Sequence, residues 1–186
     1  LLLAKNLTGY RNLLALISAS YTTTSQRGVL QEREIFAAKL GLIALSGGVR
    51  GHLWSLLNND DLEQGLQRAQ RWQSQFGDAY YLEVTRCGRT DEEQHLRRLL
   101  DIAALSGIGV VATNDVCFAE PEDFEAHETR VCINEGRTLN DGRRERRYSE
   151  WQSLRSPEEM LELFRDIPVA LTNAVEIAKR CNVEVA

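Results

Sequence analysis

The sequence predicts an α/β fold in which short strands and helices alternate along most of the chain. Apolar runs of strand length end at glycine or polar residues, and the stretches between them repeat apolar residues at helical spacing. This alternation is typical of parallel strands with helices packed on them. With 186 residues, 43% of them hydrophobic, the chain is long enough to bury one sizeable core.

The first part of the chain is predicted to form a strand over residues 1–4, followed by a helix. Thr8 is expected to cap this helix, because its hydroxyl can accept a hydrogen bond from a free backbone N–H of the first turn. Five apolar residues of the helix are expected to share one face: Tyr10, Leu13, Leu14, Ile17 and Tyr21. A polar loop over 22–28, a short helix over 32–38 and a second strand over 41–46 complete this part.

The middle of the chain continues the same alternation after Gly47-Gly48. A helix starting at Asp60 or Asp61 keeps five residues in register, which predicts core positions for Leu62, Leu66, Ala69, Trp72 and Phe76. The third strand is predicted over 80–85. Thr90-Asp91-Glu92-Glu93 indicates a capping box that opens the next helix, and the fourth strand follows over 108–112.

The last third of the chain is predicted to be helical, with segments near 121–134, 156–164 and 168–181. Ser156 is expected to cap the middle segment, with Pro157 in its first turn and Glu159 completing a capping box. The sequence therefore predicts two parts, an α/β portion over 1–120 and a helical portion over 121–186.

Composition excludes several protein classes. No apolar run approaches the roughly 18 residues that a membrane span needs, so no membrane partner is expected. The four cysteines lack C-x-x-C spacing, which excludes a zinc ribbon and suits a reducing, cytoplasmic compartment. A net charge of −5 argues against a general polyanion-binding surface. The basic run over 143–148 is interpreted as a solvated loop, with contact to phosphate or an acidic partner left open.

Polar side chains follow two predicted strands and form the candidate site. Glu83 and Cys87 end the third strand, and Asp115 and Cys117 come after the fourth. In barrels of parallel strands the loops after the strand ends carry the chemistry, so these four residues are site candidates by position. The alternative is that Asn114-Asp115 only forms a turn or a helix cap.

These two segments resemble signature segments of the PHP (polymerase and histidinol phosphatase) domain, in the version carried by the alpha subunit of bacterial DNA polymerase III. Further matching segments follow in the family's order: Leu45-Ser46-Gly47-Gly48, Ala126-His127-Glu128, Ser156-Pro157-Glu158-Glu159-Met160 and Glu176-Ile177-Ala178-Lys179-Arg180-Cys181-Asn182. The resemblance implies a TIM-like barrel that is incomplete here, with its first strands and histidine-rich motifs expected before Leu1. The helical portion is expected to complete this domain and to lead to the polymerase domain.

The chain departs from the family at the metal ligands. Metal-binding members have histidine where this chain has Cys87 and Cys117, and often cysteine where it has Gly48. Only Glu83 and Asp115 of the implied ligand set are unchanged. Because imidazole is the usual nitrogen ligand of hydrolytic metal sites, we expect no metal, with Glu83 and Asp115 as weak candidates. Thiolates also bind zinc, so a residual site of Glu83, Cys87, Asp115 and Cys117 stays open.

The resemblance implies that the parent protein is a DNA-directed DNA polymerase whose two Mg²⁺ ions and DNA are held by other domains. This segment is then expected to be a non-catalytic scaffold, with no cofactor of its own, that docks the proofreading exonuclease subunit beside other replicase subunits. His127 is expected to have a structural role. One alternative is an active metal-dependent phosphoesterase or 3′–5′ exonuclease. A free-standing histidinol-phosphatase relative is disfavoured by the segment from Ser156 to Asn182.

Overall fold

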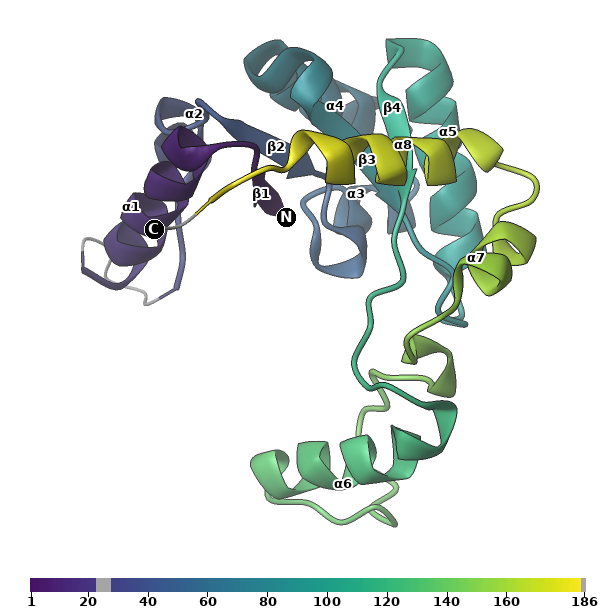
Figure 1. Cartoon of the computed structure of the whole chain (residues 1–186). Helices are drawn as coiled ribbons and strands as arrows, with labels where there is room; N and C mark the ends of the chain where they lie inside the picture. Colours follow the sequence, from purple (N-terminus) through teal and green to yellow (C-terminus); the bar gives the residue numbers. More distant parts are fainter. Residues whose placement is uncertain (23–27, 185–186) are drawn as a thin grey trace.

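A computed structural model describes residues 1–22 and 28–184, and the sheet within them has four strands (Figure 1). The strands are β1 (Leu2–Ala4), β2 (Leu42–Leu45), β3 (Tyr80–Val84) and β4 (Gly109–Ala112). The α-helices are α1 (Leu7–Thr22), α2 (Glu32–Ala37), α3 (Trp54–Asn58), α4 (Leu62–Phe76), α5 (Glu92–Ser106), α6 (Phe124–Glu135), α7 (Pro157–Leu163) and α8 (Pro168–Arg180). Four short 3₁₀ helices lie between them: η1 (Gly48–Arg50), η2 (Gly77–Ala79), η3 (Pro121–Asp123) and η4 (Glu150–Gln152). An α/β fold is therefore confirmed.

The strands lie in the order β1-β2-β3-β4, and only part of the sheet is parallel. β3 pairs in parallel with both β2 and β4, as the sequence predicts. The expectation of a fully parallel sheet is wrong for β1, which pairs antiparallel with β2. The sheet is open across the described ranges, so closure into a barrel stays a prediction, as does a domain boundary after residue 120.

The antiparallel pairing follows from an extra leg of chain between β1 and β2. Gly28 N–H donates to the Ser20 carbonyl near the end of α1, and Lys5 N–H donates to the Gly41 carbonyl at the end of β1. The segment from 28 to 41 therefore runs back along α1 before β2 begins. With a single helix between them, two neighbouring strands run in the same direction and pair in parallel. Here the segment from 28 to 41 returns the chain once more, so β2 runs opposite to β1. The loop expected over 22–28 falls largely outside the described residues.

The core lies between the sheet and the helices packed on it. All four residues of β2 are buried, and α4 and α5 pack together beside β3. α8 crosses β4, where Asn173 Nδ2 donates to the Val110 carbonyl over 2.7 Å (Figure 1). Trp72 is 7% exposed and belongs to this core, as predicted. No helix among the described residues is long and apolar enough to cross a membrane.

The helix α1 begins two residues earlier than a cap at Thr8 predicts, and it is capped differently. Asn6 Oδ1 accepts from the Gly9 N–H over 3.0 Å, so the cap is Asn6 and the expectation for Thr8 is wrong. The buried residues of α1 are Gly9, Leu16 and Ser20. The predicted apolar face therefore does not coincide with the buried face, a difference taken up below.

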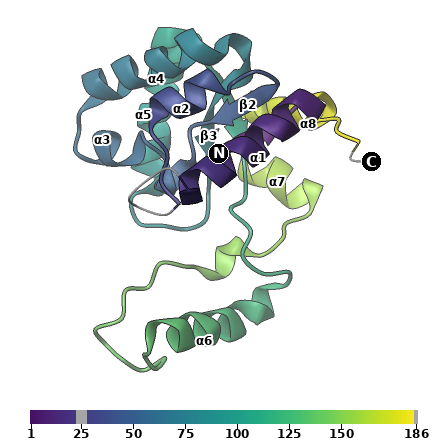
Figure 2. The ribbon, with the colours of Figure 1, turned by 90° about the vertical axis from the view of Figure 1, so that its left-hand side faces the viewer.

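Residues 118–154 form a lobe that projects from the sheet and contains η3, α6 and η4 (Figure 1, Figure 2). Within it, Arg144 and Glu128 form an ion pair of 2.5 Å, and both side chains are only 5% exposed. The interpretation of the run over 143–148 as a solvated loop is therefore wrong for Arg144. Its guanidinium ties the loop to α6, because a buried carboxylate requires a charge partner.

Candidate functional site

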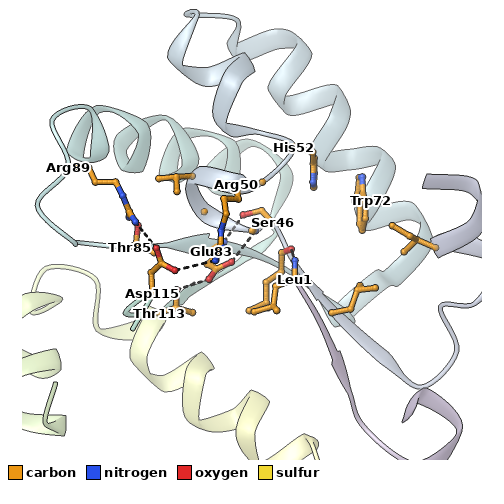
Figure 3. A pocket seen from close by; sticks show the side chains of 17 residues that line it. Leu1, Ser46, Arg50, His52, Trp72, Glu83, Thr85, Arg89, Thr113 and Asp115 are labelled. Carbon is orange, nitrogen blue, oxygen red and sulfur yellow. Dashed lines mark hydrogen bonds and ion pairs between the residues drawn. The ribbon is translucent and has the colours of Figure 1, made fainter. Parts of the chain in front are cut away.

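A cavity of about 530 Å³ lies where β2, β3 and β4 end (Figure 3). Its polar lining comes from the segments that leave these three strands: Ser46, Gly47, Gly48, Arg50, Glu83, Thr85, Arg89, Thr113 and Asp115. His52 and Trp72 line another side. The carboxyl ends of the parallel strands thus bring Glu83 and Asp115 to one pocket, as their positions in the sequence predict.

Glu83 is bound by neutral donors from both neighbouring strand ends. It is 9% exposed, and its carboxylate accepts from the Gly47 N–H over 3.0 Å and from Thr113 Oγ1 over 2.6 Å. Its own N–H donates to Ser46 Oγ over 2.8 Å. These bonds hold the ends of β2, β3 and β4 together and occupy both carboxylate oxygens.

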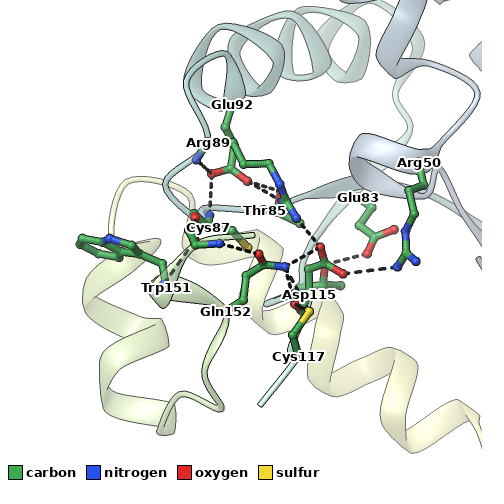
Figure 4. A network of polar contacts seen from close by, with 12 residues as sticks. Arg50, Glu83, Thr85, Cys87, Arg89, Glu92, Asp115, Cys117, Trp151 and Gln152 are labelled. Carbon is green, nitrogen blue, oxygen red and sulfur yellow. Dashed lines mark hydrogen bonds and ion pairs between the residues drawn. The ribbon is translucent and has the colours of Figure 1, made fainter. Parts of the chain in front are cut away.

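Asp115 is bound by two arginines and an amide (Figure 4). Arg89 Nη2 lies 2.6 Å from Oδ2, Gln152 Nε2 lies 3.1 Å from the same oxygen, and Arg50 Nη2 lies 3.4 Å from Oδ1. Arg89 is 18% exposed, and Arg50 is 85% exposed. Burial alone would lower the pKa of Arg89, but the bond to Asp115 and the charges around it raise it. Arg89 therefore supplies a permanent positive charge next to Asp115.

The two thiols do not complete a metal site with these carboxylates. Cys87 is fully buried, and its N–H donates to Glu92 Oε2 over 2.5 Å. Burial, and then the charge of Glu92, raise the pKa of the Cys87 thiol to about 12. Burial and Asp115 also raise the pKa of Cys117, whose thiol donates to the Asp115 carbonyl over 3.5 Å. Neither thiol lines the cavity.

The donor set does not fit a metal ion. Both oxygens of Glu83 already accept hydrogen bonds from Gly47 and Thr113, and Asp115 is paired with Arg89 at 2.6 Å. Among the described residues, no group of three or more His, Cys, Asp or Glu side chains is placed to hold a metal. The arrangement can bind side chains to one another, but it offers no set of converging ligands with an open position for water.

The unpredicted residues of this network include Arg89, Glu92 and Gln152. Arg89 lies two residues after Cys87, and a cation there could have been recognised as a partner for a carboxylate at the next strand end. Glu92 was assigned to a capping box, but Asp91 makes no side-chain cap. Instead, Glu92 accepts from Thr85 Oγ1 over 2.6 Å inside the protein. Gln152 carries no local signal, since it comes from η4, far along the chain.

Gln152 joins the pocket to the lobe. The side chain is completely buried, and its Nε2 donates to the Asp115 carbonyl, to Asp115 Oδ2 and to Cys117 Sγ at 3.1, 3.1 and 3.3 Å. Its backbone carbonyl accepts from the Cys117 N–H over 2.8 Å. The lobe is therefore anchored on the same carboxylate that binds the arginines.

The histidines lie outside this network. His52 stacks on Trp72 with 4.7 Å between ring centroids, and its Nε2 is 3.2 Å from Tyr80 Oη. His95 is 5% exposed and packs on Trp54. His127 lies in the lobe, 3.3 Å from Arg130, and does not line the cavity. Burial and a nearby arginine lower the pKa values of His52 and His95 to about 4.

The buried His95 and the half-buried His52, both neutral, predict that stability falls with acidification. Between pH 6.5 and about 4 the unfolded chain binds protons at His52 and His95 while the folded chain does not. The free energy of unfolding should thus decrease across this window, by about 1 kcal/mol per pH unit for each ring. Urea unfolding at several pH values measures this slope. The variants His52→Gln and His95→Gln should each flatten it, and an unchanged slope in both would contradict the assignment.

The sequence of this chain is similar to those of known proteins. Residues 1–87 match the PHP domain. The chain is 48% identical over 186 residues to the DNA polymerase III subunit alpha of Pseudomonas aeruginosa, and 48% identical to that of Vibrio cholerae. It is 46% identical to that of Escherichia coli over 189 residues. Each match covers 98% or 99% of this chain and 16% of the relative. Residues 1–87 are therefore similar to a PHP domain, and nearly the whole chain is similar to one segment of DNA polymerase III alpha subunits.

Proposed function

We propose that this chain is part of a DNA polymerase III alpha subunit, in which it is a degenerate, non-catalytic PHP domain. It acts as a structural scaffold and as a docking site for the proofreading exonuclease subunit. Identity of 46–48% along nearly the whole chain supports the parent protein. The segment spans only 16% of those relatives, so template-directed DNA synthesis is assigned to the whole polypeptide.

The observation that carries the scaffold role is the arginine at the former metal position. Asp115, a residue that the family resemblance places in a metal ligand set, has Arg89 at 2.6 Å and Gln152 at 3.1 Å. A guanidinium supplies positive charge without binding a nucleophilic water, whereas hydrolysis at such sites requires a metal-bound water. The same carboxylate also holds the lobe through Gln152. Glu83 therefore connects the ends of three strands, and Asp115 connects the sheet to the lobe.

The polymerase chemistry belongs to other parts of the parent protein. Two Mg²⁺ ions on acidic side chains outside this segment would stabilise the attacking and leaving oxygens of nucleotide addition. The net charge of −5 supports placement of the DNA on other domains, since DNA binding requires basic surfaces. As part of a replicase, the protein is expected in the cytoplasm with the other replicase subunits.

The runner-up function is a metal-dependent 3′–5′ exonuclease, and metal analysis separates the two. In the complete polypeptide we expect no stoichiometric metal and no metal-dependent release of nucleotides from a DNA 3′ end. The proofreading subunit, added separately, is expected to bind and to supply that release. Measurements are elemental analysis, a 3′-labelled oligonucleotide assay and co-elution of the two subunits.

Two outcomes would overturn this proposal. Stoichiometric metal, together with nuclease activity that both Cys87→Ala and Cys117→Ala remove, would establish the exonuclease alternative. Failure of the proofreading subunit to co-elute would remove the docking role. The metal and nuclease measurements would still decide whether the pocket is catalytic. Arg50→Gln is the matched control, because the exposed Arg50 lines the same pocket without belonging to the ligand set.

A further inference from the structure

The helix α1 carries more apolar surface than the fold covers. Its 16 residues include one charged side chain, Arg11. At about 100° per residue, the apolar positions of this helix extend over roughly half of its circumference. Gly9, Leu13, Leu16 and Ser20 form the part of this arc that faces the protein. The other part is a separate stripe, centred about 100° further around the helix.

This second stripe, the α1 seam, is made of Leu7, Tyr10, Leu14, Ile17 and Tyr21. Leu7 is 43% exposed, Leu14 is 48%, Ile17 is 55% and Tyr21 is 62%. Thr8, Arg11, Ala15 and Ser18 occupy the polar side of the helix, which is an ordinary solvent-facing surface. The exposure is thus concentrated on large apolar side chains that lie along one line, which is unusual for a surface that faces only water.

The spacing of the α1 seam indicates the kind of element that covers it. The intervals between its residues are three, four, three and four, which is the a/d repeat of a helix that packs lengthwise against another helix. A strand or an irregular loop does not require this repeat. The seam lies at the periphery of the molecule, beside β1 and α2, with α1 in front in Figure 2.

We propose that the α1 seam is covered by an amphipathic helix of the same polypeptide that lies outside residues 1–186. This inference rests on the proposed parent protein, because relatives at 48% identity are about six times as long as this chain, which covers 16% of them. The covering helix presents apolar residues at its own a and d positions.

A helix in the same polypeptide fits the seam better than a second copy of the chain. A stable complex between separate molecules buries about 800 Å² on each partner, because association must offset the loss of translational and rotational freedom. Five side chains that are already partly covered offer much less area than that. Within one polypeptide the two helices are held together by the chain, so a seam of this size is sufficient.

The test is cysteine labelling in the complete polypeptide. Ile17→Cys places a thiol on the seam, and Ala15→Cys places a matched thiol on the polar side of the same helix. Maleimide modification is followed for the peptide containing each site by mass spectrometry. We expect the thiol at position 17 to react about tenfold more slowly than the thiol at position 15. Adding Leu14→Glu to Ile17→Cys should remove this protection, whereas Ser18→Glu should not.

Three results would overturn the proposal. Equal rates at positions 15 and 17 would mean that the seam faces water. Protection that disappears on dilution would assign the seam to a second copy. Protection that requires the proofreading subunit would assign it to that partner. Each result is independent of the metal and nuclease measurements, so failure of the covering helix is distinguishable from failure of the proposed scaffold role.

Discussion

Substituting Gly9 by alanine should disrupt the packing of α1 on the turn that leads into β2. A Cβ atom at position 9 would lie far inside van der Waals contact with the Gly41 carbonyl oxygen and 2.6 Å from the carbonyl carbon. Backbone atoms cannot rotate away as the end of a side chain can. Gly41 also has a φ of 76°, and its carbonyl accepts from the Lys5 N–H over 2.8 Å, so the turn has little freedom to move.

We expect Gly9→Ala to lower the free energy of unfolding by about 3 kcal/mol or more, although alanine is the better helix former. Urea unfolding followed by circular dichroism measures the loss. The control is Gly142→Ala, since nothing lies within 4 Å of a Cβ there and the residue has no positive φ. Equal stability of the two variants would show that α1 and the turn at Gly41 are not in contact.

Replacing Asp115 by alanine is the second large effect. It leaves the guanidinium of Arg89, which is 18% exposed, without its nearest carboxylate, and it removes one acceptor of the buried Gln152 amide. Glu92 lies 3.5 Å from Arg89 Nη1 and still compensates part of its charge, so the loss should be at the lower end for a broken buried pair, about 3 kcal/mol. We therefore expect a loss of that size in urea unfolding.

A matched control separates the buried pair from the exposed one. Arg50→Gln removes a guanidinium that is 85% exposed and 3.4 Å from the same carboxylate, and surface ion pairs contribute little. It should change the free energy of unfolding by less than about 0.5 kcal/mol. The double variant Arg89→Met/Asp115→Leu removes both buried charges and should recover much of the loss. If Asp115→Ala were as mild as Arg50→Gln, the network would not be the anchor described here.

The sequence predicted the parts of the site that follow from strand geometry. Glu83 and Asp115 meet in the pocket because parallel strands deliver their carboxyl ends to one edge. Cys87 and Cys117 lie beyond the strand ends, where alternation no longer applies and loop conformation decides which way a side chain points. Cys87 could not be placed without knowing the turn at Gly88, whose φ is 73°, nor Cys117 without the turn at Asp115, whose φ is 30°.

The predicted capping box and the predicted apolar face of α1 failed because the same residue pattern fits more than one local structure. The motif Thr90-Asp91-Glu92-Glu93 has the composition of a capping box, but Glu93 pairs with Arg86 and Glu92 accepts from Thr85 and the Cys87 N–H. The apolar periodicity of α1 predicts which side chains avoid water, but it does not identify the element that covers them. Long-range partners such as Gln152 have no signature in the surrounding residues.

The attachment of the lobe has a mechanical consequence. Two segments join it to the sheet, and they are linked by bonds from the Cys117 N–H to the Gln152 carbonyl, and from the Leu154 N–H to the Phe118 carbonyl. A single tether would let the lobe swivel about one backbone bond, but this double connection resists torsion. A partner that pulls on α6 would therefore strain the contacts of Asp115, so force applied to the lobe is transmitted to the sheet through Gln152 and Asp115.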